Sequence, residues 1–383
     1  MKIIMMTGIS GSDVNGFAEA CVTHGNKSGG SIWKHLRFAD ILYEVDSERG
    51  RLSYDDWEDS ILKRGTALPH LRNAAFDRLL EIIEDLQEAE KKSSENILIV
   101  STHATFWWRK TLQAGLDLTR LNELNPELFV TIIDDVLNTW NRLRETKQPR
   151  WDEMSPVDIL EWREIEIFMT EQFSQISGSK DKPKPFFLFS RNQSPLSLIR
   201  IVNEPNVRRY YRSYPMTFVS GRPEVQKDSD QIGEELSEIA VVFDPKDLED
   251  WDRKEQLKES YQAWCEERGY TFSGAEWQDI IRHLLHQTVS RDHRLIDQSH
   301  GVVVYYPELE YWTEADSRYR LTPLVPFSSG VLDEMQYATQ QGKVVYLIWT
   351  SDRDPGPFLP SIYSEKFKSG KDLVKYLRTK KNK

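Results

Sequence analysis

The segment KIIMMTGISGSDVNG, residues 2–16, decides the fold of the first half of the chain. Its opening part, Lys2–Thr7, is short and apolar on both faces, which is typical of a parallel strand buried beneath helices. A glycine-rich turn follows and leads into a helical stretch through Cys21. Further apolar runs alternate with helical stretches such as Asn73–Lys92, and this alternation predicts an α/β fold with a doubly wound parallel sheet.

The predicted strands form two sets, separated by the proline- and arginine-rich segment Asn203–Pro215. The first set comprises Lys2–Thr7, Ile32–Phe38, Ile97–Ser101, Phe129–Asp134, Phe186–Ser190 and Leu198–Val202. The second set comprises Met216–Gly221, Ile239–Pro245, Gly301–Pro307 and Lys343–Thr350, with helices expected at Glu255–Arg268 and Glu276–Gln287. We therefore expect two doubly wound α/β domains, residues 1–205 and residues 206–383.

Composition narrows the classes of function. A chain of 383 residues exceeds one ordinary domain, and its net charge of −11 argues against a broadly basic nucleic-acid binder, so small molecules are the expected partners. Two cysteines make no disulfide framework, and the scattered histidines predict no metal site. The sequence contains no apolar stretch long enough to span a membrane and no signal-peptide pattern, so a cytoplasmic protein is expected.

The first glycine-rich turn has the position of a phosphate-binding loop. Glycines let backbone N–H groups and a helix N-terminus face a phosphate. The nucleotide-binding candidates are therefore Gly8, Ser10, Gly11, Ser12 and Asn15. A working P-loop ends in Gly-Lys-Ser/Thr, whereas this loop ends in Asp13, Val14 and Asn15. Without the lysine, we expect nucleotide binding or a purely structural role rather than phosphoryl transfer.

Several segments in this half resemble the archaeal-type adenylate kinase family. They are RFADILYEV at residues 37–45 and ILIVSTHAT at residues 97–105, although Ser101 replaces the family's aspartate. The resemblance covers about residues 1–203 and implies a degenerate P-loop kinase-like domain that binds ATP or AMP. It places the basic group Arg142, Arg144, Lys147 and Arg150 where the family has its lid.

A second motif lies near the C-terminus, where SSGVLDEMQYA spans residues 328–338 and QGK spans residues 341–343. The pattern predicts a glycine turn that opens a helix carrying Glu334. Ligands of open parallel sheets bind beyond the carboxyl ends of the strands, where this turn is expected. A helix N-terminus stabilises a carboxylate by about 0.3–1 kcal/mol, which predicts a charged Glu334. The alternative is an ordinary solvent-exposed helix carboxylate behind a serine cap.

This motif resembles that of the nucleoside 2-deoxyribosyltransferase family. Glu334 matches the glutamate that serves as the nucleophile in that family. Ser329, Gly330, Ala338, Gly342 and Lys343 also match, whereas Ser328, Val331, Gln336 and His300 depart from the pattern. The segment at Asp292 resembles the family's nucleoside-positioning aspartate, and Phe218–Pro223 resembles its first strand. The resemblance covers about residues 214–360 and implies a flavodoxin-like domain with no cofactor, in a homo-oligomer. Its implied substrate-binding residues are Gly221, Arg222, Ser329 and Gly330.

The leading hypothesis is therefore cleavage of an N-glycosidic bond in a nucleoside or nucleotide, or deoxyribosyl transfer. Glu334 would attack the anomeric carbon while Asp292 protonates the departing base. One alternative is a non-catalytic nucleotide sensor in a regulatory or defence assembly, and a further alternative is a nucleoside monophosphate kinase. The base, the phosphate state of the substrate, and the choice between hydrolysis and transfer stay open.

Overall fold

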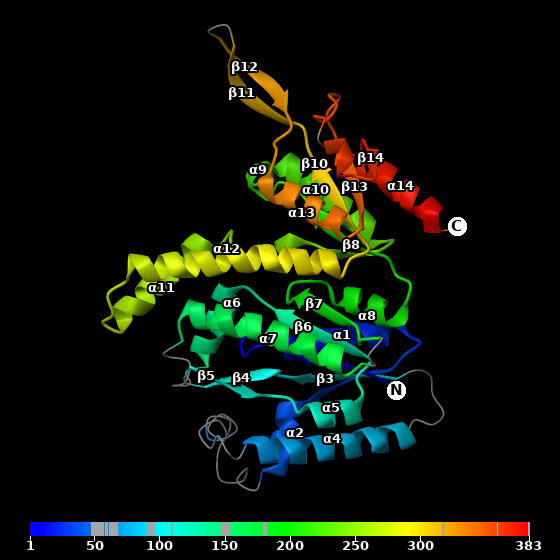
Figure 1. The fold of residues 1–383 in the computed structure, drawn as a ribbon, viewed down its shortest axis with the longest axis vertical. Helices are drawn as coiled ribbons and strands as arrows, with labels where there is room; N and C mark the ends of the chain where they lie inside the picture. The colour runs from blue at the N-terminus through cyan, green and yellow to red at the C-terminus, as the bar shows by residue number, and fades with distance from the viewer. Residues whose placement is uncertain are drawn as a thin grey trace. The chain divides into compact units, whose positions relative to one another are not determined.

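The computed structural model describes residues 1–46, 57, 60, 68–89, 96–108, 110–146, 154–178, 182–315, 318–357 and 359–381. Lys147 and Arg150 of the predicted basic group lie outside these residues. Within the described part, the fold is α/β, with two five-stranded parallel sheets flanked by helices (Figure 1). The predicted α/β class with two doubly wound sheets is confirmed.

The first sheet has the order β2-β3-β1-β6-β7, with the opening strand at its centre. Met5 of β1 pairs with Val100 on one side and with Phe129 on the other. All five residues of β1 after Lys2 are buried, which explains why this strand has no polar face. Its strands are β1 (Lys2–Thr7), β2 (Trp33–Arg37), β3 (Ile97–Thr102), β6 (Leu128–Ile133) and β7 (Phe186–Ser190).

The second sheet has the order β14-β13-β10-β8-β9. Numbered along the chain from β8, this is the 2-1-3-4-5 arrangement of flavodoxin-like sheets. The order reverses at β8, because β9 lies on one side of it and β10 on the other. Its strands are β8 (Arg209–Ser213), β9 (Val241–Phe243), β10 (Gly301–Tyr306), β13 (Val344–Trp349) and β14 (Glu365–Phe367).

Helices connect the parallel strands. Those before β8 are α1 (Val14–Ser28), α2 (Phe38–Val45), α4 (Leu68–Ala89), α5 (Leu118–Leu124), α6 (Val136–Glu145), α7 (Pro156–Ile176) and α8 (Pro195–Asn203). Those after it are α9 (Met216–Val219), α10 (Pro223–Ser237), α11 (Lys254–Glu267), α12 (Gly274–Asp297), α13 (Ser329–Gln340) and α14 (Gly370–Lys381). In the described residues, no helix is both long enough and apolar enough to cross a bilayer.

Two predicted strands are helical instead. Leu198–Val202 lies in α8, and Met216–Val219 forms the short helix α9. In α8, Leu198 and Ile199 are buried and Arg200 turns outward to bond the Ala240 carbonyl, which is a helical rather than an alternating pattern. The strand that opens the second sheet is β8, inside the segment predicted to be a linker.

The inserted segment between β10 and α13 forms a hairpin of its own. β11 (Leu309–Ala315) pairs antiparallel with β12 (Arg318–Leu324), and the hairpin extends beyond the five-stranded sheet (Figure 1). A smaller hairpin, β4 (Thr105–Trp108) and β5 (Thr111–Ala114), follows β3 in the first half. Short 3₁₀ turns occupy Pro245–Asp247 and Leu359–Ser361.

The chain divides into two compact units that are not contiguous in sequence. Unit 1 comprises residues 1–199 and 247–288, and unit 2 comprises residues 200–246 and 289–383. This division differs from the single boundary predicted between residues 205 and 206. Helix α12 contributes its first part to unit 1 and its last part to unit 2.

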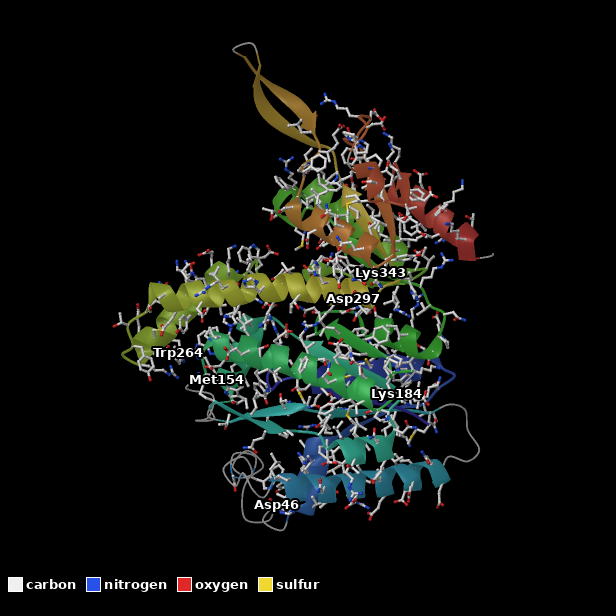
Figure 2. All side chains as sticks on the ribbon, in the orientation of Figure 1. Asp46, Met154, Lys184, Trp264, Asp297 and Lys343 are labelled. Atoms are coloured by element: carbon white, nitrogen blue, oxygen red, sulfur yellow. The ribbon has the colours of Figure 1, made fainter. Side chains whose placement is uncertain are left out.

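Apolar packing explains why residues 247–288 belong to unit 1. Trp140 of α6 lies 6.0 Å from Trp264 of α11, measured between ring centroids. The same apolar cluster contains Met154, Ile280 and Leu284, and Met154 and Trp264 are labelled in Figure 2. Burial of several aromatic and aliphatic side chains, each contributing about 1.5–3 kcal/mol, holds α11 and the start of α12 on this unit.

Candidate functional site

Glu334 lies in the second turn of α13, close to the carboxyl edge of the second sheet. The helix begins after Ser328, whose side chain accepts a hydrogen bond from the backbone of Val331 at 3.5 Å. Val331, Met335 and Ala338 form the buried face of the helix. Glu334 is adjacent to this face, and its carboxylate reaches the side chains of β8.

Two hydroxyl groups from β8 hold the carboxylate of Glu334. The Tyr211 hydroxyl donates to Oε1 at 2.8 Å, and the Ser213 hydroxyl donates to Oε2. Residues two apart on a strand point to the same face, which is why both reach one carboxylate. Because both oxygens hold a hydrogen bond, the orientation of the carboxylate is fixed.

The Glu334 carboxyl does not keep the charge that the sequence predicts. Its pKa is raised to about 8, chiefly by burial and after that by the neighbouring carboxyl of Asp292. The hydroxyls of Ser213 and Tyr211 lower the pKa, but by less. The helix N-terminus stabilises a carboxylate only modestly, and burial beside a second carboxyl outweighs it. In the free protein Glu334 is therefore mostly protonated at neutral pH.

Asp292 comes from the last part of α12 and is buried with Arg291. Nε of Arg291 donates a hydrogen bond to Oδ1 of Asp292 at 2.9 Å, and Nη2 of the same guanidinium lies 2.8 Å from that oxygen. Burial raises the pKa of Asp292, whereas Arg291 and the Tyr211 hydroxyl lower it. Burial is the largest cause that raises the pKa of Tyr211, and the charges of Asp292 and Glu334 raise it further. Tyr211 is thus next to both carboxyl groups.

Three aromatic residues surround the same edge of the sheet. Tyr306 ends β10 and Trp349 ends β13, with ring centroids 5.8 Å apart, and Phe327 lies 5.8 Å from Tyr306. Burial raises the pKa of Tyr306, and the charge of Glu334 raises it in the same direction. Phe327 is 52% exposed, which leaves one ring of the group accessible from solvent.

The site lies where open α/β sheets usually bind their ligands, beyond the carboxyl ends of the strands and at the point where the strand order reverses. Ser213 pairs with Val304 near the ends of β8 and β10. The strand order reverses at β8, and crevices at such a switch point are the usual ligand sites. Glu334, Tyr211, Ser213 and Asp292 all belong to unit 2.

The predicted substrate-binding residues lie in two loops. Ser329 and Gly330 form the first, exposed turn of α13. Gly221 has a φ of +77°, in the region that favours glycine, and it precedes Arg222, whose guanidinium bonds the Glu310 carbonyl at 3.4 Å. The segment Phe218–Pro223 is therefore a short helix and a turn, not the strand that the resemblance implied.

Lys343, another matched residue, has a structural role. Its ammonium donates to the carbonyls of Asp297 at 2.9 Å and Ser299 at 2.6 Å, and Figure 2 labels it beside Asp297. These bonds satisfy carbonyl groups at the C-terminal end of α12, where a cation is favourable.

Unit 1 contains the degenerate phosphate-binding loop. Asp13 is the N-cap of α1 with a left-handed φ of 57°, and its carboxylate accepts a hydrogen bond from the Gly16 N–H at 3.2 Å. The other oxygen of Asp13 accepts from Arg191 Nε at 2.7 Å. A carboxylate of the chain itself therefore occupies the helix N-terminus that a phosphate would use.

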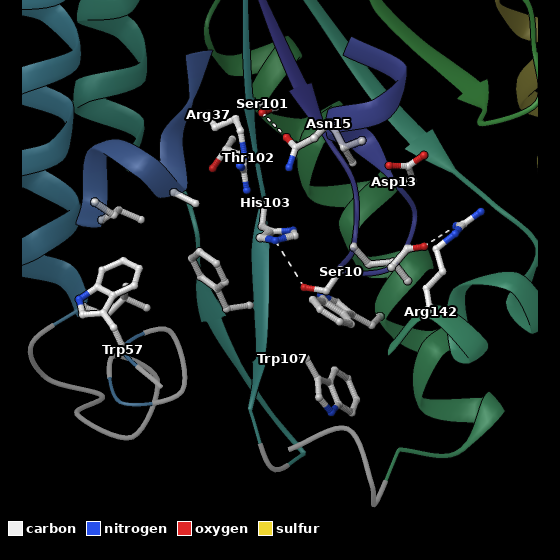
Figure 3. A pocket seen from close by; sticks show the side chains of 18 residues that line it. Ser10, Asp13, Asn15, Arg37, Trp57, Ser101, Thr102, His103, Trp107 and Arg142 are labelled. Carbon is white, nitrogen blue, oxygen red and sulfur yellow. Dashed lines mark hydrogen bonds between the residues drawn. The ribbon is translucent and has the colours of Figure 1, made fainter. Parts of the chain in front are cut away.

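A cavity of about 350 Å³ adjoins this loop. Ser10, Gly11, Asn15 and Arg142 line it, as predicted for a ligand site in this loop (Figure 3). Asn15 accepts a hydrogen bond from Ser101 at 2.7 Å, and Ser10 lies 3.5 Å from His103 Nε2, as the dashed lines in the figure mark.

Other predicted nucleotide-binding residues do not face the cavity. Ser12 is buried and donates to the Ile9 carbonyl at 2.7 Å. A Cβ atom on Gly8 would lie 2.6 Å from the Ile132 carbonyl, so this residue packs against β6. Arg144 pairs with Glu267 at 3.1 Å, over the ring of Trp140. Arg144 lies on the far side of α6 from Arg142, which explains why Arg142 lines the cavity and Arg144 does not.

Sequence reasoning missed Tyr211, Ser213 and Arg291. The first two lie in the segment assigned to a linker, where arginines interrupt the apolar pattern. Arg212 is nevertheless buried, because it pairs with Asp244 at 2.9 Å and donates to Ser229. The run of tyrosines was the available signal, since tyrosine is enriched in strands.

Within the described residues, no group of three or more His, Cys, Asp and Glu side chains has an arrangement that would hold a metal ion.

Comparisons with known proteins give little further information. No family model matches the sequence. No curated protein matches it either. Among solved structures, an uncharacterized protein from Eubacterium ventriosum is similar at 12% sequence identity and a TM-score of 0.25, covering 52% of this chain and 95% of that one.

Proposed function

We propose that unit 2 cleaves the N-glycosidic bond of a nucleoside or nucleotide, with Glu334 as nucleophile. The observation that carries this proposal is the Glu334 carboxyl, held by Tyr211 and Ser213 at the switch point of the sheet with Asp292 beside it. The resemblance of this motif to the nucleoside 2-deoxyribosyltransferases gives the substrate class.

In the proposed reaction, Glu334 and Asp292 together hold one proton before the substrate binds. Arg291 favours the charged form of Asp292, so the proton is mainly on Glu334 in the free site. Transfer of this proton to a ring nitrogen of the base, through Asp292, leaves Glu334 as a carboxylate. A Glu334 oxygen then bonds to the anomeric carbon, while the C–N bond breaks and its electron pair leaves with the protonated base.

The surrounding groups fit these steps. The hydroxyls of Tyr211 and Ser213 fix which oxygen faces the sugar, as pre-organisation requires. Phe327 is 52% exposed and lies 6.3 Å from the buried ring of Trp349, so it offers a flat apolar surface against which a base can stack. Water, or a second base, would then release the sugar from Glu334, and both outcomes are compatible with the same first step.

The test is incubation of the full chain with mixed nucleosides and nucleotides, with free base detected by mass spectrometry. We expect Glu334→Ala to abolish base release. The matched control is Asp333→Asn, because Asp333 is the neighbouring carboxylate of α13 and is exposed. Equal release by the parent protein and Glu334→Ala would refute the assignment.

The same incubation separates the alternative functions. A non-catalytic sensor would bind a nucleotide in calorimetry and release no base. A nucleoside monophosphate kinase would transfer phosphate from ATP to AMP. The kinase has little support, because the buried Val14 stands at the lysine position and Asp13 caps the helix.

A further inference from the structure

The cavity of unit 1 has largely aromatic walls. Trp57, Phe106, Trp107 and Trp162 line it together with His103 (Figure 3). The rings of Trp107 and Trp162 are 6.5 Å apart at an interplanar angle of 35°, and His103 lies 6.1 Å from Trp162. Aromatic side chains stack against other flat rings, including the heteroaromatic rings of nucleobases.

Polar groups are concentrated at one part of the cavity. Asn15 uses its amide oxygen to accept from Ser101, and its amide nitrogen carries two further donors. The Nδ1 atom of His103 contacts the Gly8 carbonyl, which can only accept, so this nitrogen carries a proton. His103 Nε2 then faces Ser10 and the cavity. These groups can bond to the edge of a base or to sugar hydroxyls.

The charges around the cavity are already paired. Arg142 pairs with Asp134 at 2.6 Å and donates to the Gly11 carbonyl, and Arg37 lies 3.7 Å from Asp40. Asp13, which is itself paired with Arg191 at 2.7 Å, places its carboxylate at the helix N-terminus, where a phosphate would otherwise bind. A phosphate entering this loop would meet that carboxylate, at a cost that an uncharged ligand avoids.

We propose that this cavity is a second, non-catalytic site that binds a nucleobase or nucleoside without a phosphate group. Aromatic walls, hydrogen-bonding groups at one side and a self-capped helix N-terminus together define this ligand class. The proposal is independent of the glycosidase chemistry of unit 2.

The test is isothermal titration calorimetry of the full chain carrying Glu334→Gln, which removes the turnover proposed for unit 2. The ligands are adenosine, guanosine, cytidine, uridine and their 5′-monophosphates. We expect at least one nucleoside to bind, with its monophosphate binding no more tightly. Asn15→Ala should weaken that binding by about tenfold, because a hydrogen bond to the ligand is lost.

Two further variants keep the result interpretable. Phe327→Ala, on unit 2, should leave this binding unchanged. Asp13→Gly should raise the affinity for the monophosphate by about tenfold over the nucleoside, since it frees the Gly16 N–H and Arg191 in a backbone conformation that glycine favours. A gain of affinity is not produced by misfolding.

Three results would overturn the proposal. The first is tighter binding of a monophosphate than of its nucleoside by the parent protein. The second is binding that Phe327→Ala removes and Asn15→Ala leaves intact, which would place the ligand in unit 2. The third is the absence of binding by all the nucleosides. The first and third results leave the assignment of Glu334 untouched, because base release is measured separately.

Discussion

The Tyr211 hydroxyl donates a 2.8 Å hydrogen bond to Glu334 and thereby joins the middle of β8 to α13. Replacing Tyr211 with Phe removes this bond while keeping the buried ring. In the proposed reaction Glu334 becomes a carboxylate before it attacks, and a hydrogen bond to a charged group contributes about 1.5–3 kcal/mol, so we expect base release to slow by about 10- to 100-fold. Steady-state kinetics of the variant, with folding checked by circular dichroism, measures the effect.

The matched control for this variant is Tyr214→Phe. Tyr214 is a nearby buried tyrosine whose hydroxyl bonds Asp244 at 3.4 Å instead of Glu334. We expect it to keep the parental rate. An equal loss of rate in both variants would show that the effect is general damage to the sheet edge rather than loss of positioning.

The raised pKa of Glu334 makes the stability of the protein depend on pH. Between about pH 4.5 and about pH 8, the folded state retains a proton on Glu334 that the unfolded chain has lost. The free energy of unfolding therefore falls as the pH rises through this window. In Glu334→Gln this contribution is absent, so the variant should gain stability relative to the parent as pH rises.

Thermal unfolding of both proteins over a series of pH values measures this difference. Asp333→Asn serves again as the control, because it changes an exposed carboxylate on the same helix. A constant difference between Glu334→Gln and the parent across the window would contradict the proposed protonation of Glu334.

Asp292→Asn should affect both stability and chemistry. The substitution weakens the contacts of the buried Arg291, at an expected cost of about 1–3 kcal/mol. It also removes the neighbouring charge that raises the pKa of Glu334, so the pH-dependent loss of stability should still begin near pH 4.5 but should end at a lower pH than in the parent. Base release should be lost with the proton relay. Full release by this variant would exclude Asp292 from the reaction.

The ion pair between Arg163 and Asp250 supports the discontinuous unit 1. Arg163 Nη1 lies 2.7 Å from Asp250, both side chains are buried, and Asp250 also accepts from the Val136 N–H. Asp250→Ala leaves the guanidinium with its bonds to Gln287 and the Asp134 carbonyl but without its carboxylate, and breaking a buried pair in this way costs about 3–5 kcal/mol. Chemical denaturation measures this loss. A cost below about 1 kcal/mol would mean that the pair is effectively solvated.

The sequence predicted the parallel strands that are continuous apolar runs, because burial on both faces leaves a clear pattern, but the short apolar runs in α8 and α9 gave a similar pattern and are helical. It did not predict β8, where Arg212 is buried against Asp244. In the sequence, Arg212 looks like a residue of a polar linker. Its partner Asp244 lies 32 residues later, and only the fold shows that the two are adjacent. Likewise, Trp264 and Trp277 identify an apolar helix pair, but nothing in their spacing tells which unit they cover.

The candidate site was predicted in part. Glu334 and Asp292 were identified from local motifs, and their interaction depends on the fold bringing α12 and α13 to the same strand. Tyr211 and Ser213 have no local motif, since their role comes from their register on β8. The charge state of Glu334 was predicted incorrectly, because a helix N-terminus is visible in sequence and desolvation is not.

Because residues 247–288 complete unit 1 from within the second half of the chain, neither unit corresponds to a single stretch of the gene. A truncation near residue 205 would remove Leu257, Trp264 and Ile280 from the surface that they cover. A recombination event at this point would leave unit 1 incomplete, because unit 1 alone draws on both sides of the break, while nearly all of unit 2 would stay on one fragment.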